Sequence, residues 1–137
     1  DVLSARDVDA IYMHSDCVYS ESTVQTLKEM DQYAPRGEDG HIFIAAIDGC
    51  SGNLALIREG STDQASGQPI PDFGSMVVEY IEKKLNGETI EEGTVVKDGA
   101  LWSPAQLVMT DVGFQLYLST TDISIDNVDN PGLWGNQ

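Results

Sequence analysis

The pattern of hydrophobic positions predicts alternating strands and helices over the first part of the chain. The clearest strand is residues 42–47, an apolar run that stops at Asp48 and Gly49. An apolar run without polar alternation is typical of a strand that helices cover on both faces of a parallel sheet. A helix is predicted next over residues 53–59, because apolar residues recur there at helical spacing and Gly60 stops it.

Two more strands are predicted around this centre. Residues 9–15 form a short strand that ends at Asp16, and a helix follows with Ser22 as its N-cap and Pro35 after its end. Residues 62–67 form a more polar strand. Because of that polarity we expect this third strand at the sheet edge or at a crossover.

The pattern changes after one long helix, which opens at Pro71 and stops at Asn86-Gly87. The residues predicted to trace one face of it are Phe73, Val77, Tyr80, Ile81, Lys84 and Leu85. Short β-like runs separated by turns follow over residues 93–96, 106–110 and 114–118, and residues 1–7 read as the end of a helix. The order strand, helix, strand, helix, strand, helix predicts an α/β fold, with a parallel Rossmann-like sheet flanked by helices and right-handed crossovers.

Composition and charge exclude several partners. The chain of 137 residues is long enough for one domain, and its hydrophobic content of 41% is ordinary for a globular protein. Lys+Arg 7 against Asp+Glu 23 gives a formal net charge of −16. Such a field repels nucleic acid and anionic membranes, so no nucleic-acid partner is predicted. No apolar run approaches the length of a membrane span.

Polar side chains gather where the predicted strands end. Asp16 and Asp48 follow the first two strands, Gln68 follows the third, and Ser15 and His14 lie next to Asp16 in the sequence. Ligands of open α/β sheets bind at the carboxyl ends of the strands. A carboxylate accepts hydrogen bonds from two hydroxyls, and an amide both donates and accepts, which suits a polyhydroxyl ligand. Alternatively, Asp16 and Asp48 only cap the helices that follow them.

The two cysteines lie just past these carboxylates, Cys17 after Asp16 and Cys50 two places after Asp48. If their strands are neighbours, the two sulfurs fall within bridging distance. Two small buried thiols are the alternative, and the sequence favours them slightly. Two cysteines without a C-x-x-C motif do not predict zinc or thioredoxin-type chemistry.

Catalytic and metal sites are not predicted, and neither is a cofactor. His14 and Asp16 share a strand face while Cys17 lies beyond the end of that strand, so a Cys-His nucleophile is not formed. The chain has no G-x-S-x-G elbow and no phosphate-cradling glycine loop. Residues 122–133 begin like a calcium loop, but Asn127 and Leu133 replace its Gly and Glu.

Several short motifs together resemble a known family. They are M-H-S-D (13–16), I-D-G (47–49), S-G-Q-P (66–69), L-N-G-E (85–88) and the closing S-I-D-N-V-D-N-P-G-L-W-G-N (124–136). In this order they resemble the sugar-binding proteins of ABC transporters, specifically the ribose- and galactose-binding group of type I periplasmic binding proteins. Two departures are Ser15, where the family usually has Asn, and residues 91–113, a stretch longer than the usual connection.

The resemblance implies reversible, non-catalytic binding of a monosaccharide or polyol and its delivery to the membrane permease of an ABC transporter. It implies a periplasmic or extracellular protein whose signal peptide is removed. It covers only the later half of the family's chain, so residues 1–68 would be a second-lobe segment and residues 69–137 a return to the first lobe with the C-terminal tail. The N-terminal half of the same protein is then an expected partner. The alternatives are the effector domain of a LacI-like transcription regulator and, less favoured, a small α/β enzyme.

Overall fold

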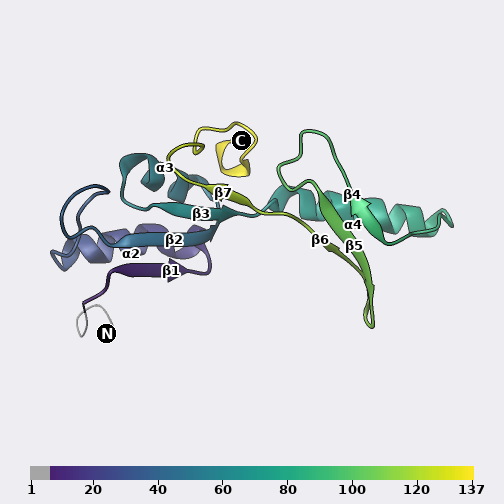
Figure 1. The fold of residues 1–137 in the computed structure, drawn as a ribbon, viewed down its shortest axis with the longest axis horizontal. Helices are drawn as coiled ribbons and strands as arrows, with labels where there is room; N and C mark the ends of the chain where they lie inside the picture. The colour runs from purple at the N-terminus through teal and green to yellow at the C-terminus, as the bar shows by residue number, and fades with distance from the viewer. Residues whose placement is uncertain (1–6) are drawn as a thin grey trace. The chain divides into compact units, whose positions relative to one another are not determined.

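The computed structural model describes residues 7–137, which form a mixed α/β fold (Figure 1). The chain divides into two compact units. Unit 1 contains the described residues up to Gly67 together with Asp122–Gln137, and unit 2 is Gln68–Thr121. Except for Asp7, the helix end predicted at residues 1–7 lies outside the described residues. The final segment, which the sequence-based division groups with the return to the first lobe, belongs to unit 1.

Unit 1 is built on a four-stranded, mostly parallel sheet. Its strands are β1 (Ala10–Met13), β2 (Phe43–Asp48), β3 (Gln64–Gly67) and β7 (Thr121–Ile123), in the order β1-β2-β3-β7. The first three strands are parallel, and Asp48 at the end of β2 is the register partner of Gly67 at the end of β3. The predicted parallel sheet flanked by helices is therefore confirmed at this level.

Of the two positions predicted for the third strand, the sheet edge and a crossover, the sheet edge is wrong. β3 lies between β2 and β7, because the chain returns from unit 2 and adds β7 beside it. This pairing joins segments far apart in the sequence, so the polar composition of residues 62–67 carries no trace of it. Burial still alternates along β3, since Ala65 is buried while Gln64 and Ser66 are only half-buried.

Two helices follow the first two strands. α2 (Asp16–Glu29) starts directly after Ser15, whose backbone is extended, and not at the predicted Ser22. Ser22 lies inside the helix, where its Oγ donates to the carbonyl oxygen of Tyr19 at 3.0 Å. α3 (Ser51–Glu59) ends as predicted at Gly60, whose left-handed φ of +77° is readily adopted by glycine.

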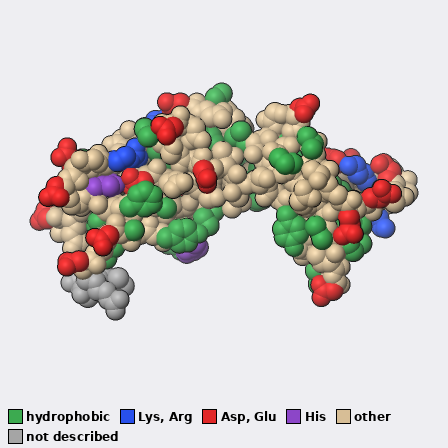
Figure 2. Space-filling model, in the orientation of Figure 1, with side chains coloured by type: hydrophobic (Ala, Val, Ile, Leu, Met, Phe, Trp, Pro, Cys, Tyr) green, Lys and Arg blue, Asp and Glu red, His purple; other side chains and the backbone are tan. Residues whose placement is uncertain are grey.

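The core of unit 1 lies on one face of its sheet. Met13, Ile44 and Ala46 pack with residues of α2, and Ala65 packs with Leu54 and Ile57 of α3. On the opposite face Tyr12 is 68% and Phe43 is 45% exposed. Figure 2 shows hydrophobic side chains at the surface of unit 1. Within the described residues, the prediction that helices cover both faces of β2 is therefore wrong.

Topology explains this one-sided cover. The chain passes from β1 to β2 to β3 in one direction across the sheet. Right-handed crossovers that all progress in one direction place every connecting helix on the same side of a parallel sheet. α2 and α3 therefore share a face, and neither of them covers the other face.

Unit 2 combines one helix with a small antiparallel sheet. The helix is α4 (Ile70–Leu85), and the sheet contains β4 (Gly93–Val95), β5 (Ala105–Thr110) and β6 (Gly113–Tyr117), in sequence order. The three predicted β-like runs are confirmed. The small core contains Met76 of α4 with Trp102 and Ala105.

The predicted apolar face of α4 is not its buried face. Val77 is 58%, Ile81 is 52% and Leu85 is 81% exposed, while Met76 is the buried residue of the helix. Turning Met76 toward the sheet leaves the main apolar stripe outside the core of unit 2. Among the described residues, no helix combines the length and apolar character that crossing a bilayer requires.

Candidate functional site

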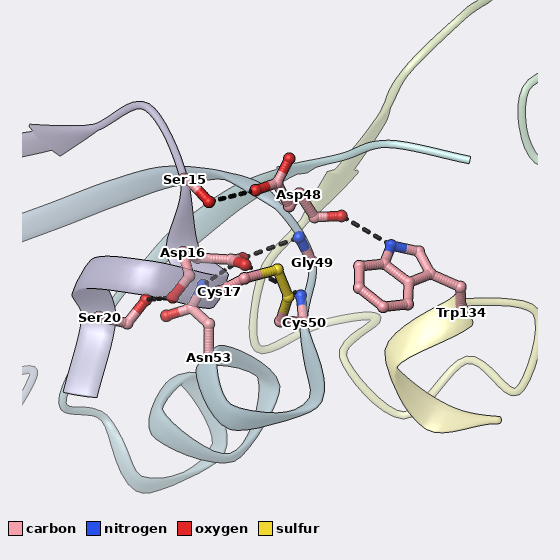
Figure 3. The surroundings of a disulfide bond; sticks show 9 residues. All are labelled: Ser15, Asp16, Cys17, Ser20, Asp48, Gly49, Cys50, Asn53 and Trp134. Carbon is pink, nitrogen blue, oxygen red and sulfur yellow. Dashed lines mark hydrogen bonds between the residues drawn. A yellow bond between two sulfur atoms is a disulfide. The ribbon is translucent and has the colours of Figure 1, made fainter. Parts of the chain in front are cut away.

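The candidate site lies in unit 1, at the carboxyl ends of β1 and β2 (Figure 3). Asp48 is the last residue of β2, and Ser15 links β1 to α2. The Oγ of Ser15 donates a hydrogen bond to Oδ2 of Asp48 at 2.6 Å. The parallel pairing of β1 with β2 thus joins two of the predicted site residues, which lie in different motifs of the sequence.

Asp48 has an unusual backbone conformation. Its φ is +110°, a region that L-residues rarely adopt, and the next residue, Gly49, has a φ of +85°. A residue held in such a sparsely populated region costs on the order of 1–3 kcal/mol. It persists only where its surroundings fix it, and such strain is concentrated at functional sites. Asp48 is half-buried, so part of the residue remains exposed to solvent.

Asp16 has a different role from Asp48. It is 3% exposed, and its Oδ2 accepts from the Gly49 amide at 2.8 Å and from Nδ2 of Asn53 at 3.1 Å. Its Oδ1 accepts from the Cys50 amide at 3.0 Å. Asp16 therefore ties the first residue of α2 to the turn that begins α3. These bonds leave its carboxylate little capacity for a ligand, so Asp16 is a structural residue and not the ligand contact that the sequence predicted.

Burial of Asp16 has an electrostatic consequence. Desolvation raises the pKa of its carboxyl above the ordinary value of 3.8, and the negative charge of Asp48 adds to the increase. The hydrogen bonds from Cys50, Gly49 and Asn53 act in the opposite direction, because they favour the ionised form. The net direction of the pKa shift is upward, so folding disfavours the ionised form of Asp16 relative to the unfolded chain.

Cys17 and Cys50 form a disulfide, with a Cα–Cα distance of 5.3 Å. Cys17 is exposed and Cys50 half-buried, so the favoured alternative of two buried thiols is not what the structure shows. The bond joins the first turn of α2 to the residue before α3. Both sulfurs and an oxygen of Asp16 lie within 4.8 Å of one another, but the disulfide already uses the sulfurs and leaves no thiolate for a metal.

The other two predicted site residues, His14 and Gln68, are close in sequence to Ser15 and to the end of β3, respectively. His14 is exposed, and its ring lies against Tyr19 with centroids 5.0 Å apart. Gln68 is the first residue of unit 2 and directly follows Gly67, the register partner of Asp48.

Sequence reasoning missed two residues of the site, Trp134 and Asn53. Nε1 of Trp134 donates to the carbonyl oxygen of Asp48 at 2.8 Å. Asn53 donates to Asp16 and accepts from Oγ1 of Thr62 at 2.9 Å, and it is 1% exposed. A polar residue in the first turn of α3 was the only sequence signal for Asn53. For Trp134 the only signal was a large aromatic residue in the C-terminal motif.

The arrangement provides the carboxylate of a half-buried residue, fixed in direction, with a hydroxyl beside it. A carboxylate only accepts hydrogen bonds when ionised, whereas a serine hydroxyl both donates and accepts. Groups that donate hydrogen bonds are the chemical complement of this combination. The chain matches no protein-family model and no protein of curated function.

Proposed function

We propose that this chain is the later half of a sugar-binding protein of the type I periplasmic binding protein family. It binds a monosaccharide or polyol reversibly, without catalysis, for delivery to the permease of an ABC transporter. The observation that carries the proposal is Asp48, a half-buried aspartate in a strained conformation at the carboxyl end of a parallel strand.

In this proposal Asp48 accepts hydrogen bonds from two neighbouring hydroxyls of the sugar. Its bond from Ser15 directs the carboxylate and leaves its other oxygen for the ligand. Ser15 and His14 add donors and acceptors from unit 1. Asp16 acts indirectly, by holding the turn that carries Asp48.

The path of the chain supports the family assignment. The resemblance implies two lobes built from alternating segments of sequence. The chain leaves unit 1 after Gly67, forms unit 2, and returns to unit 1 at Asp122. We assign unit 1 to the second lobe and unit 2 to the first.

Uncovered apolar surface supports the proposed N-terminal half. Tyr12 and Phe43 are exposed on the open face of the unit 1 sheet, and Val77, Ile81 and Leu85 are exposed along α4 of unit 2. Large exposed apolar patches mark surfaces that another element covers. We propose that the first half of the same protein packs on both surfaces.

The disulfide supports the proposed location. Disulfides persist in oxidising compartments, such as the periplasm or the exterior of the cell. The Cys17–Cys50 bond joins two segments at the site. In a periplasmic or extracellular protein this bond would stay oxidised and keep the site rigid.

A thermal-shift screen of the intact protein tests the proposed function. D-ribose, D-galactose, D-glucose and D-mannitol are the probes, because a compound that binds only the folded state raises the Tm. We expect at least one of them to raise the Tm of the parent and to have a much smaller effect on the variant Asp48→Asn. The proposal fails if every probe leaves the parent unchanged, or if a probe shifts parent and variant equally.

A further inference from the structure

The C-terminal tail packs against the turn that follows β2. It ends in a short 3-10 helix, η1 (Trp134–Asn136). Figure 3 shows the indole of Trp134 directed at the main chain of Asp48, where Nε1 donates to the carbonyl oxygen at 2.8 Å. A Cβ added at Gly135 would clash with the carbonyl oxygen of Gly49 and lie 2.9 Å from the amide nitrogen of Ser51. The tail therefore touches this turn closely, and only glycine fits at position 135.

The tail is anchored independently of Asp48. Arg58 of α3 donates from Nε to Asp129 at 2.7 Å. Its Nη2 donates to the carbonyl oxygen of Val128 at 3.1 Å and to Oδ1 of Asn136 at 2.7 Å. Nδ2 of Asn136 in turn donates to the carbonyl oxygens of Val128 and Asn130 at 2.8 and 2.9 Å. These bonds fix the tail to α3, so the position of Trp134 does not depend on its own bond to Asp48.

One peptide group is consequently held at both ends. The carbonyl oxygen of Asp48 accepts from Trp134, and the N–H of Gly49, in the same peptide group, donates to Oδ2 of Asp16 at 2.8 Å. On the side of β7, a Cβ at Gly49 would lie 2.8 Å from Cδ1 of Ile123. This peptide group directly follows the strained φ of Asp48, and its orientation fixes where the strand ends and the turn begins.

We infer that Trp134 is a positioning residue for the ligand-binding carboxylate. It fixes the Asp48–Gly49 peptide, and through it the direction in which the Asp48 side chain meets a sugar. Without the indole N–H, the backbone of Asp48 relaxes toward an ordinary φ and its carboxylate turns among several rotamers. The inference rests on the proposed function for its effect on affinity, but its effect on the local structure does not need a ligand.

Two variants remove the restraint in different ways. Trp134→Phe removes the N–H donor and keeps an aromatic ring, whereas Gly135→Ala keeps the indole and pushes the tail away. The matched control is Trp102→Phe in unit 2. The buried Nε1 of Trp102 has no hydrogen-bond partner among the described residues, so this substitution removes an indole N–H without removing a hydrogen bond. All three are made in the intact protein, and thermal melts first establish that each variant folds.

Two measurements are made on each protein. NMR gives the amide exchange rate of Gly49 and the three-bond couplings that report the χ1 rotamer of Asp48. Calorimetric titration gives the affinities for D-ribose and D-galactose. We expect Trp134→Phe and Gly135→Ala each to speed exchange at Gly49 about tenfold, to average the Asp48 couplings, and to weaken sugar binding about three- to tenfold. Trp102→Phe leaves all of these unchanged.

The outcomes separate the inference from the proposed function. If the parent binds neither sugar and the local changes occur, Trp134 positions Asp48 as inferred and the proposed function fails for these sugars. If exchange at Gly49 and the Asp48 couplings in both variants equal those of the parent, the inference is overturned, whatever the affinity. It is also overturned if the local changes occur and a sugar that binds the parent binds both variants equally well.

Discussion

The hydroxyl of Ser15 and the carboxylate of Asp48, 33 residues apart in the sequence, meet at 2.6 Å. The bond crosses from the end of β1 to the end of β2, and it directs one oxygen of the carboxylate. A hydrogen bond to a charged acceptor is shorter and stronger than one between neutral groups. Ser15 also precedes α2, but its side chain makes no capping hydrogen bond to that helix. Its hydroxyl is therefore committed to Asp48 and not to the helix.

The variant Ser15→Ala tests this commitment. We expect sugar affinity to fall about three- to tenfold, because Asp48 loses the bond that directs it and the ligand loses a neighbouring hydroxyl. The free energy of unfolding should change by less than roughly 1 kcal/mol, since no cap is lost. Calorimetric titration and urea melts measure the two quantities, and Ser22→Ala, an exposed serine of α2, is the control. A large loss of stability with unchanged affinity would make Ser15 a structural residue.

The disulfide should contribute much of the stability of unit 1. It closes a loop with a sequence separation of 33. A loop of this length corresponds to about 3–4 kcal/mol in the chain-entropy description. We expect the double variant Cys17→Ser/Cys50→Ser to lose a stabilisation of that order in urea melts, and dithiothreitol to lower the stability of the parent but not of the variant. Equal stability of the oxidised parent and the double variant would show that the bond contributes nothing to folding.

Asp16 should make stability depend on pH with an unusual sign. Its pKa in the folded protein lies above the ordinary value of 3.8, mainly because of burial. The folded state then binds more protons than the unfolded state in the window above 3.8, so the contribution of Asp16 to stability falls as pH rises through that window. Below 3.8 the carboxyl is protonated in both states and its contribution is constant.

The measurement compares the parent with Asp16→Asn, which does not titrate at this position. Urea melts at several pH values between about 3 and 7 give the free energy of unfolding of each protein. We expect the parent-minus-variant difference to decrease as pH rises above 3.8. A difference that increases with pH would mean that the three hydrogen bonds to the carboxylate outweigh its desolvation.

The sequence was sufficient for the strands and helices that have strong local signals. β2 was visible as an apolar run ending at Asp48-Gly49, and the end of α3 was visible at Gly60. The start of α2 was missed because residues 16–21 lack helical apolar periodicity. Asp16 and the disulfide hold this first turn through contacts with residues 49–53. A local pattern cannot register contacts of that kind.

The site shows the same division between local and distant contacts. Parallel strands bring their carboxyl ends to one edge, so the meeting of Ser15 with Asp48 followed from the order of elements. The bond from Trp134 to Asp48 spans 86 residues and depends on the path of the tail. The buried Asp16 accepts a hydrogen bond from Asn53, which lies 37 positions further along the chain. For that reason the sequence could not separate the half-buried Asp48 from the structural Asp16.

The central claim is that Asp48 binds a sugar, and the variant Asp48→Asn tests it most directly. Asparagine keeps the size, tolerates a positive φ at least as well as aspartate, and keeps one acceptor for Ser15. It loses the charge and the capacity to accept from several hydroxyls. The control is Asp111→Asn, an exposed carboxylate between β5 and β6 that removes the same charge from unit 2.

Calorimetric titration of the intact protein with the sugar that raises its Tm, alongside urea melts, gives affinity and stability for the parent and both variants. We expect Asp48→Asn to weaken binding at least about tenfold, because hydrogen bonds to a charged group contribute roughly 1.5–3 kcal/mol, and to change stability by less than about 1 kcal/mol. Asp111→Asn should behave like the parent. Parent-like sugar affinity in Asp48→Asn, together with a large loss of stability, would contradict the claim and make Asp48 a structural residue.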